Sequence, residues 1–164
     1  MLPFYSAYFA AGKATMYKHI LIATDGSELA QKGIEQGLAL ARDLGSVVTI
    51  LTVTEPFPSY AMAGDTGWVA SPADIERYTA GRREFAERLL AKSKEEAKRV
   101  GVAADLLHLE DRFPAEGIIA AAKDNGCDLV VMASHGRRGL GRLLLGSQTI
   151  EVLTHSKVPV LVVR

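Results

Sequence analysis

The sequence predicts an α/β fold in which a parallel β-sheet is covered by helices on both faces. Five short runs rich in Val, Ile and Leu alternate along the chain with four stretches of helical periodicity. Strands and helices that alternate at this spacing form βαβ units, whose parallel strands are buried on both faces. The length of 164 residues fits a single domain.

The composition excludes several classes of protein. The 19 basic and 19 acidic residues balance, which argues against a broad surface for nucleic acid or for a membrane. No apolar run approaches the ~20 residues of a membrane span. The one cysteine, Cys127, precedes an apolar run, so we expect a buried thiol, no intrachain disulfide and a cytoplasmic setting.

The first βα unit is predicted from a buried apolar run and a capped helix. A strand is expected over 17–24, and Ser27 is a good N-cap for the helix that follows. That helix is expected to continue to about residue 43 and to end at Gly45, before a second strand over 47–54.

A long irregular segment separates the second strand from the second helix. Residues 55–78 contain several prolines and glycines, and a loop of this length in a compact domain is often functional. From about Pro72 the sequence becomes highly charged with spaced apolar residues, which predicts a surface helix over 72–99 that ends before Gly101.

The third and fourth strands are expected over 102–109 and 128–133. Between them, Pro114 fits the first position of a helix that continues through residue 122 and is ended by Gly126.

The chain is expected to finish with a helix over 147–155 and a strand over 158–163. Pro159 removes a backbone donor early in this last strand, which favours an edge position in the sheet. Such an apolar edge needs a cover.

The strongest functional signal lies between the fourth strand and the last helix, over 133–149. This segment is rich in glycine and arginine, and glycines let the backbone approach an anion. The N–H groups at a helix start, together with the helix dipole, favour negative charge there. The segment lacks the lysine of a Walker A loop and the third glycine of a dinucleotide-binding fingerprint.

Three blocks of the chain match one family pattern in the right order. They are ILIATDGS at 20–27, Gly136 followed by nine residues and then Gly146-Ser147, and SKVPVLVV at 156–163. With these blocks the chain resembles the universal stress protein family over 16–164, and residues 1–15 are expected to be an N-terminal extension. The resemblance implies a flavodoxin-like sheet of order 3-2-1-4-5 and a homodimer, formed through the C-terminal strand.

The resemblance also implies a site for an adenine nucleotide, ATP or else ADP or AMP. In nucleotide-binding relatives, the residue matching Asp25 lies near the ribose or a metal, and the one matching Val53 offers backbone atoms to adenine. The residues matching Gly136, Gly146, Ser147 and Thr149 hold the phosphates. The complete predicted site comprises Ala23, Thr24, Asp25, Val53, Met132, Ala133, His135, Gly136, Arg137, Gly146, Ser147, Gln148 and Thr149.

Several of these residues also have a purely structural interpretation. Asp25 can hold Mg²⁺ through water or can simply form the Asp-Gly turn. Ser147 can cap the last helix, contact phosphate, or do both. His135 can bind a phosphate or satisfy the loop backbone, and of the arginines at 137, 138 and 142 we expect at most one to contact phosphate.

Ala133 stands where the family pattern has its first glycine. A methyl group there costs affinity if the position needs a positive φ or a close approach of the ligand. The methyl is harmless if the backbone is ordinary β, which is usual for the last residue of a strand, and binding is then retained.

Three functional hypotheses from different classes remain open. The first is a cytoplasmic nucleotide-binding sensor or regulatory module with no catalytic residue. The second is a dimeric interaction module that binds no nucleotide. The third is an enzyme of the wider adenine nucleotide α-hydrolase-like group, in which Tyr60, Met62 and Trp68 would line a lid.

Overall fold

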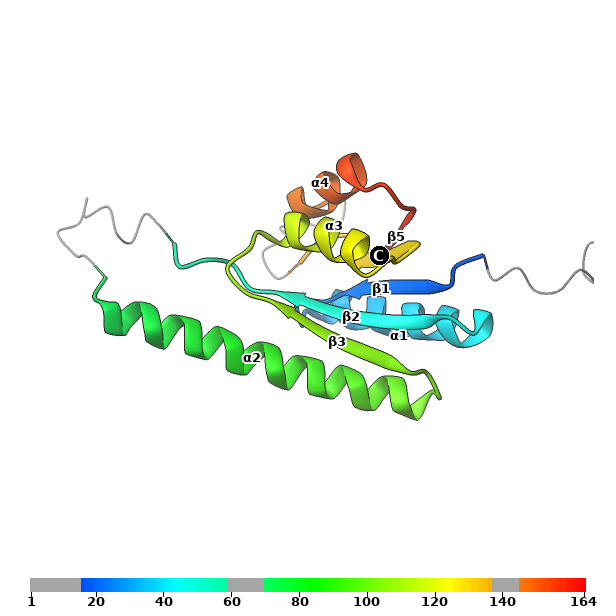
Figure 1. Ribbon diagram of the computed structural model, residues 1–164, viewed down its shortest axis with the longest axis horizontal. Coiled ribbons are helices and arrows are strands. Elements are labelled where there is room, and N and C mark those ends of the chain that lie inside the picture. Colours follow the sequence, from blue (N-terminus) through cyan, green and yellow to red (C-terminus); the bar gives the residue numbers. More distant parts are fainter. Residues whose placement is uncertain (1–15, 59–69, 137–144) are drawn as a thin grey trace, which may run out of the picture.

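The computed structural model describes residues 16–58, 70–136 and 145–164; the expected N-terminal extension lies outside these residues. Strands and helices alternate along the described chain as the sequence predicts (Figure 1). In chain order they are β1 (His19–Ala23), α1 (Glu28–Leu44), β2 (Val47–Val53), α2 (Pro72–Arg99), β3 (Ala104–Leu109), α3 (Pro114–Asp124), β4 (Leu129–Ala133), α4 (Ser147–His155) and β5 (Val160–Val163).

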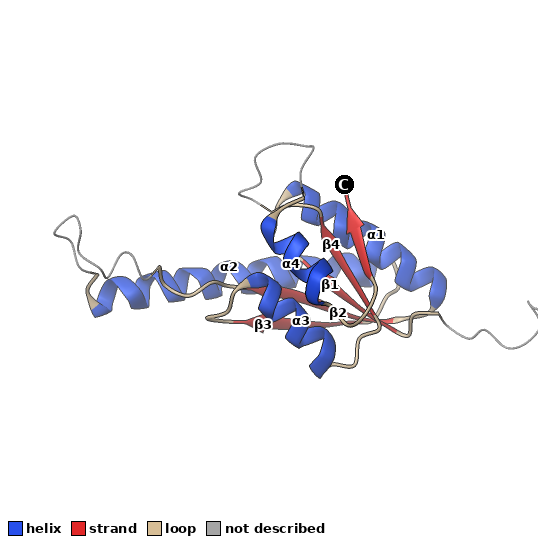
Figure 2. Ribbon diagram, turned by 90° about the horizontal axis from the view of Figure 1, so that it is seen from above, coloured by secondary structure: helices blue, strands red, loops and turns tan. Residues whose placement is uncertain are grey.

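The five strands form one sheet in the order β3-β2-β1-β4-β5, and every neighbouring pair is parallel. Figures 1 and 2 show α1 and α2 on one face of this sheet and α3 and α4 on the other. The predicted flavodoxin-like order and the helices on both faces are therefore confirmed.

The central strand β1 supplies both halves of the hydrophobic core. Ile20 and Ile22 pack under α1 and α2, whereas Leu21 and Ala23 pack under α3 and α4. This division follows from the two-residue period of a strand. Ile20, Leu21 and Ile22 are fully buried, so β1 is an almost continuous apolar run rather than an alternating one.

Two helical glycines bring helices close to the sheet. A Cβ atom at Gly37 of α1 would lie 2.6 Å from Cδ1 of Ile22, and one at Gly117 of α3 would lie 2.9 Å from Cγ2 of Val53. Neither distance leaves room for a methyl group. These glycines therefore cost some helix propensity but allow close packing of each helix on the strand beneath it.

The ends of the elements follow local hydrogen-bonding rules. Ser27 is the N-cap of α1 as predicted, and its Oγ accepts from the Ala30 N–H at 3.1 Å. Gly45 ends α1 in the left-handed conformation, with φ 70°. Helix α2 begins with a capping box that the sequence prediction missed, formed by Ser71 and Asp74, and hydrogen bonds from Ser71 lower the pKa of Asp74.

Some strands are shorter than predicted, for identifiable reasons. The expected first strand began at residue 17, but the N–H groups of Lys18 and His19 both donate to the carboxylate of Asp128. Pro159 precedes β5 instead of lying within it, and its carbonyl accepts from the Val130 N–H at 3.0 Å. The last strand therefore begins after the proline, where each residue has an N–H to donate.

Cys127 is 4% exposed, as expected from its place before an apolar strand. Burial, with a smaller contribution from the charge of Asp128, raises the pKa of its thiol to about 11. The thiol therefore stays protonated near neutral pH. Among the described residues, no helix is long and apolar enough to cross a membrane.

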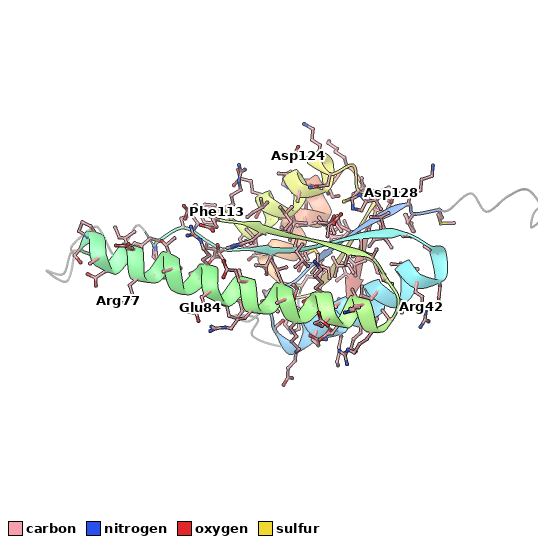
Figure 3. All side chains as sticks on the ribbon, turned by 60° about the horizontal axis from the view of Figure 1, so that its bottom comes forward. Arg42, Arg77, Glu84, Phe113, Asp124 and Asp128 are labelled. Carbon is pink, nitrogen blue, oxygen red and sulfur yellow. The ribbon has the colours of Figure 1, made fainter. Side chains whose placement is uncertain are left out.

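Asp128, labelled in Figure 3, links the starts of β1 and β4 by hydrogen bonds at the amino edge of the sheet. Its Oδ2 accepts from the Lys18 N–H at 2.8 Å and its Oδ1 accepts from the His19 N–H at 3.0 Å. Its own N–H donates to the His19 carbonyl at 2.9 Å. One carboxylate thus satisfies two backbone donors at the start of the central strand.

We expect Asp128→Ala to lower the free energy of unfolding by about 1.5–3 kcal/mol, because hydrogen bonds to a charged group are lost and backbone donors are left unsatisfied. Urea denaturation measures this change. Asp124→Ala, at the exposed C-terminal end of α3, is the control and should stay within about 0.5 kcal/mol of the unsubstituted protein. Equal effects of the two substitutions would contradict this linking role.

Candidate functional site

A cleft of about 450 Å³ opens at the carboxyl edge of β1, β2 and β4, between the starts of α3 and α4. Every residue of the predicted site that the structure describes lines this cleft. These residues are Ala23, Thr24, Asp25, Val53, Met132, Ala133, His135, Gly136, Gly146, Ser147, Gln148 and Thr149. Arg137 lies outside the described residues, as do the arginines at 138 and 142 and the expected lid side chains Tyr60, Met62 and Trp68.

The turn after β1 forms the middle wall of the cleft. The Thr24 N–H donates to the Leu51 carbonyl at 2.9 Å, so this turn continues the pairing of β1 with β2. The Oδ1 of Asp25 accepts from the Ser27 N–H at 3.0 Å, and Gly26 has a φ of 80°. Asp25 therefore forms the Asp-Gly turn, as its structural interpretation predicts, and also lines the cleft.

Gly136 makes room for the carboxylate of Asp25. A Cβ atom on Gly136 would lie 2.6 Å from Oδ2 of Asp25, closer than two such atoms can approach. This glycine thus has a packing role that does not depend on any ligand.

Gly146 closes the same loop from its other side. Its N–H donates to the Ser134 carbonyl at 2.8 Å, and a Cβ atom there would lie 3.3 Å from Cα of His135. The segment before α4 therefore runs against the segment that leaves β4. Residues far apart in the glycine-rich stretch are brought side by side at the cleft.

Helix α4 is capped by Gly146, which corrects the prediction that Ser147 is its N-cap. The Gly146 carbonyl accepts from the Ile150 N–H at 3.0 Å, so Ser147 is already the first helical residue. No described side chain caps this terminus. The N–H groups of the first turn therefore remain for water or a ligand, and the positive end of the helix dipole faces the cleft.

Two polar residues of α4 are already committed to structural hydrogen bonds. The Oγ1 of Thr149, which is 2% exposed, donates to the carbonyls of Ala133 and Ser134 at 3.1 and 3.0 Å. The Oε1 of Gln148 accepts from the Ala115 N–H at 2.8 Å and so serves the start of α3, which has no side-chain cap of its own. These atoms fix α4 in place on β4 and α3.

Ala133 is an ordinary strand residue. It ends β4, pairs with Val163 of β5 and is 8% exposed. Among the described residues other than glycine, only Asp111 has a positive φ. Ala133 therefore has ordinary β backbone geometry. This is the case in which we expect its methyl group not to interfere with binding.

The cleft also contains residues that the sequence prediction missed. Leu51, Pro114 and Ile118 add apolar surface near Val53, and Glu55 and Arg82 add charge. Arg82 is the one Lys or Arg among the described lining residues. Arg82 is on α2, which carries several exposed charged residues. The sequence pattern of this helix does not indicate which of its arginines lines the cleft.

Chemically, the cleft offers backbone donors at one end and apolar surface at the other. No group of three His, Cys, Asp or Glu side chains that could hold a metal occurs among the described residues. Asp25 could take part in holding Mg²⁺, a cation that usually keeps several waters and uses one or two carboxylates together with the phosphates of its ligand.

The fold and its cleft define the class of adenine nucleotide α-hydrolase-like α/β proteins. Within this class the chain belongs to the universal stress protein family, whose family model matches residues 16–164.

Curated relatives span most of the chain. The universal stress protein YxiE of Bacillus subtilis is 31% identical over 150 residues, which is 91% of this chain and 100% of that protein. A universal stress protein of Thermus aquaticus is 35% identical over 150 residues, again 91% of this chain and 100% of the relative.

Solved structures share the fold. Protein MJ0577 of Methanocaldococcus jannaschii aligns with a TM-score of 0.74 at 30% identity, over 90% of this chain and 96% of that one. A universal stress protein in complex with cAMP aligns with a TM-score of 0.67 at 20% identity, over 91% of this chain and 98% of that one. A relative from Archaeoglobus fulgidus, in complex with dAMP, aligns with a TM-score of 0.62 at 17% identity, over 91% and 99%.

We expect Gly136→Ala to destabilise the protein by about 1–3 kcal/mol, because the new methyl group displaces the Asp25 carboxylate from its place on the turn. Urea denaturation measures the loss. Gly81→Ala, on an exposed part of α2 where a Cβ meets nothing within 4 Å, should instead stabilise the protein by up to about 1 kcal/mol.

The contact itself is tested in an Asp25→Ala background, where Gly136→Ala should cost much less. A cost that is the same in both backgrounds would show that the carboxylate is not what excludes the methyl group.

Proposed function

We propose that this protein is a cytoplasmic adenine-nucleotide-binding module with a sensor or regulatory role. The observation that carries the proposal is the N-terminus of α4, which has no side-chain cap within the described residues and opens into a cleft whose other end is apolar. A nucleotide has the same asymmetry, with an anionic phosphate end and a flat, largely apolar base.

The phosphate end of the cleft is formed by β4, its loop and α4. The first-turn N–H groups of α4 and the helix dipole attract an anion. Gly136 and Gly146 carry no side chain that would separate a phosphate from the backbone. Asp25 faces this end from the turn after β1, where it could hold Mg²⁺ through water beside the phosphates.

The base end is formed by the carboxyl end of β2 and the start of α3. Leu51, Val53, Pro114 and Ile118 provide apolar surface there, and Met132 of β4 adds to it. Because adjacent strands lie about 4.8 Å apart, β2 and β4 are separated by roughly 10 Å across β1, a span that suits a nucleoside.

The relatives support the nature of the ligand. Two solved universal stress proteins were obtained in complex with cAMP and with dAMP, both of which carry adenine and a phosphate. We therefore propose an adenine nucleotide, with ATP, ADP or AMP as candidates. The role that we propose is binding, and no residue of the cleft is assigned a catalytic part.

We expect Ser147→Glu to weaken the binding of ATP with Mg²⁺ by about tenfold or more, because it places a carboxylate where the phosphates would lie. The same substitution should not harm α4, since an acidic residue suits the first turn of a helix. Isothermal titration calorimetry measures the affinity. Ser147→Gln, of the same size but uncharged, is the matched control and should lose much less affinity.

Thermal melting of both variants checks that the fold is intact. No binding heat from the unsubstituted protein at about 1 mM ATP would overturn the nucleotide proposal and favour an interaction module without a nucleotide.

We further propose a homodimer that is formed through β5. This strand is at the edge of the sheet, and Leu161 on it is 38% exposed. Ile150 and Leu153 of the adjacent helix α4 are 51% and 43% exposed. An exposed apolar edge of this kind is usually covered, and pairing with the same strand of a second copy would cover both edges at once.

We expect the unsubstituted protein to sediment as a dimer and Leu161→Lys to sediment as a monomer, because the substitution puts a charge on the proposed interface. Val47→Lys is the control: Val47 is also an exposed strand residue, at 51%, but it lies at the start of β2. Analytical ultracentrifugation distinguishes the states. A Leu161→Lys variant that stays dimeric and folded would place the interface elsewhere.

A further inference from the structure

Arg82 enters the cleft at the end opposite to α4. Helix α2, which carries Arg82, packs on β2 and β3, whereas α4 packs on α3 and β5. Since the sheet order places β1 and β4 between β2 and β5, the two helices approach the cleft from opposite sides. If phosphates lie at the N-terminus of α4, Arg82 is beside the base.

Aromatic side chains hold Arg82 in this position. Its guanidinium carbon lies 5.9 Å from the centre of the Tyr78 ring, one helical turn earlier on α2. The Tyr78 ring packs edge-on against Phe57, at 5.2 Å between ring centres and an interplanar angle of 84°. Phe57 belongs to the segment that follows β2. The contacts of Phe57 with Tyr78 and of Tyr78 with Arg82 therefore hold the arginine near the carboxyl end of β2.

The guanidinium keeps a buried donor that has no acceptor. The Nε of Arg82 is inaccessible to solvent, and the described part of the chain gives it no hydrogen-bond partner. A buried donor without an acceptor is rare, since it loses its hydrogen bonds to water and gains none in return. Neighbouring arginines on α2 differ: Arg83 and Arg88 are paired with Glu110 and Glu84.

We propose that Arg82 recognises the base of the bound nucleotide, by donating a hydrogen bond from a terminal N–H of its guanidinium, beyond the buried Nε, to a ring nitrogen of adenine. This inference rests on the proposed nucleotide function. Adenine presents ring nitrogens N1, N3 and N7 as acceptors, and Arg82 is the one Lys or Arg that lines the described part of the cleft. Arg82 is then a specificity-determining residue and takes no part in holding phosphate.

The experiment compares affinities measured by calorimetry with Mg²⁺ for ATP and for three analogues in which carbon replaces N1, N3 or N7. We expect the unsubstituted protein to bind one analogue about tenfold more weakly than ATP, because that analogue lacks the acceptor. In Arg82→Met, which keeps the length of the side chain without its donors, ATP should bind about tenfold more weakly and the difference between ATP and that analogue should vanish.

Two further variants separate the hydrogen bond from charge and from folding. Arg82→Lys keeps the charge but lacks the planar guanidinium that directs the N–H donors, so it should also lose the discrimination among the analogues. Arg88→Met, on an exposed side chain of the same helix, should bind all four ligands as the unsubstituted protein does. Melting curves establish that each variant is folded.

The outcomes distinguish this inference from the function on which it rests. If the unsubstituted protein binds none of the four ligands, the proposed function fails and the inference fails with it. If it binds ATP and Arg82→Met binds ATP equally well, the inference alone is overturned. The inference is also overturned if Arg82→Met weakens ATP and inorganic tripolyphosphate by the same factor, because Arg82 would then act on the phosphates.

Discussion

The structure depends on β1 being paired on both sides and buried on both faces. The chain passes from β1 to β2 and β3 in one direction and then returns to place β4 and β5 on the other side. Because the order reverses at β1, the connections after β1 and β4 leave toward opposite faces of the sheet, and a crevice remains between them. The position of the cleft thus follows from the strand order and does not depend on which side chains line it.

The side chains then stabilise that crevice with contacts that serve packing and binding together. Asp25 forms its turn and lies against Gly136, while Thr149 ties α4 to the last residues of β4. The glycine-rich pattern that marks the family is therefore explained in part by the protein's own packing. A relative could keep this pattern for folding alone, so the pattern by itself is weaker evidence of a ligand than the open end of α4.

Hydrophobic periodicity and helix-capping residues predicted most of the fold. They also predicted the parts of the cleft that lie at the ends of β1 and β4. Apolar runs located all five strands, and Ser27, Gly45 and Pro114 marked helix ends correctly. The errors have physical causes: Ser147 looks like a cap until the Gly146 carbonyl is seen to accept the first helical bond. Arg82 could not be found from sequence, because its place in the cleft depends on how α2 packs on the sheet and on the contact with the ring of Tyr78.

The shared hydrogen bond between Gln148 and Ala115 has a consequence for how the cleft meets a ligand. The helix that faces the cleft with its N-terminus also completes the first turn of its neighbour, so α4 cannot swing outward without leaving the Ala115 N–H of α3 unsatisfied. The N–H groups of the first turn of α4 are therefore ordered before any ligand binds. A ligand that binds at that end, as we propose, therefore costs the protein little conformational entropy, because α4 does not have to rearrange.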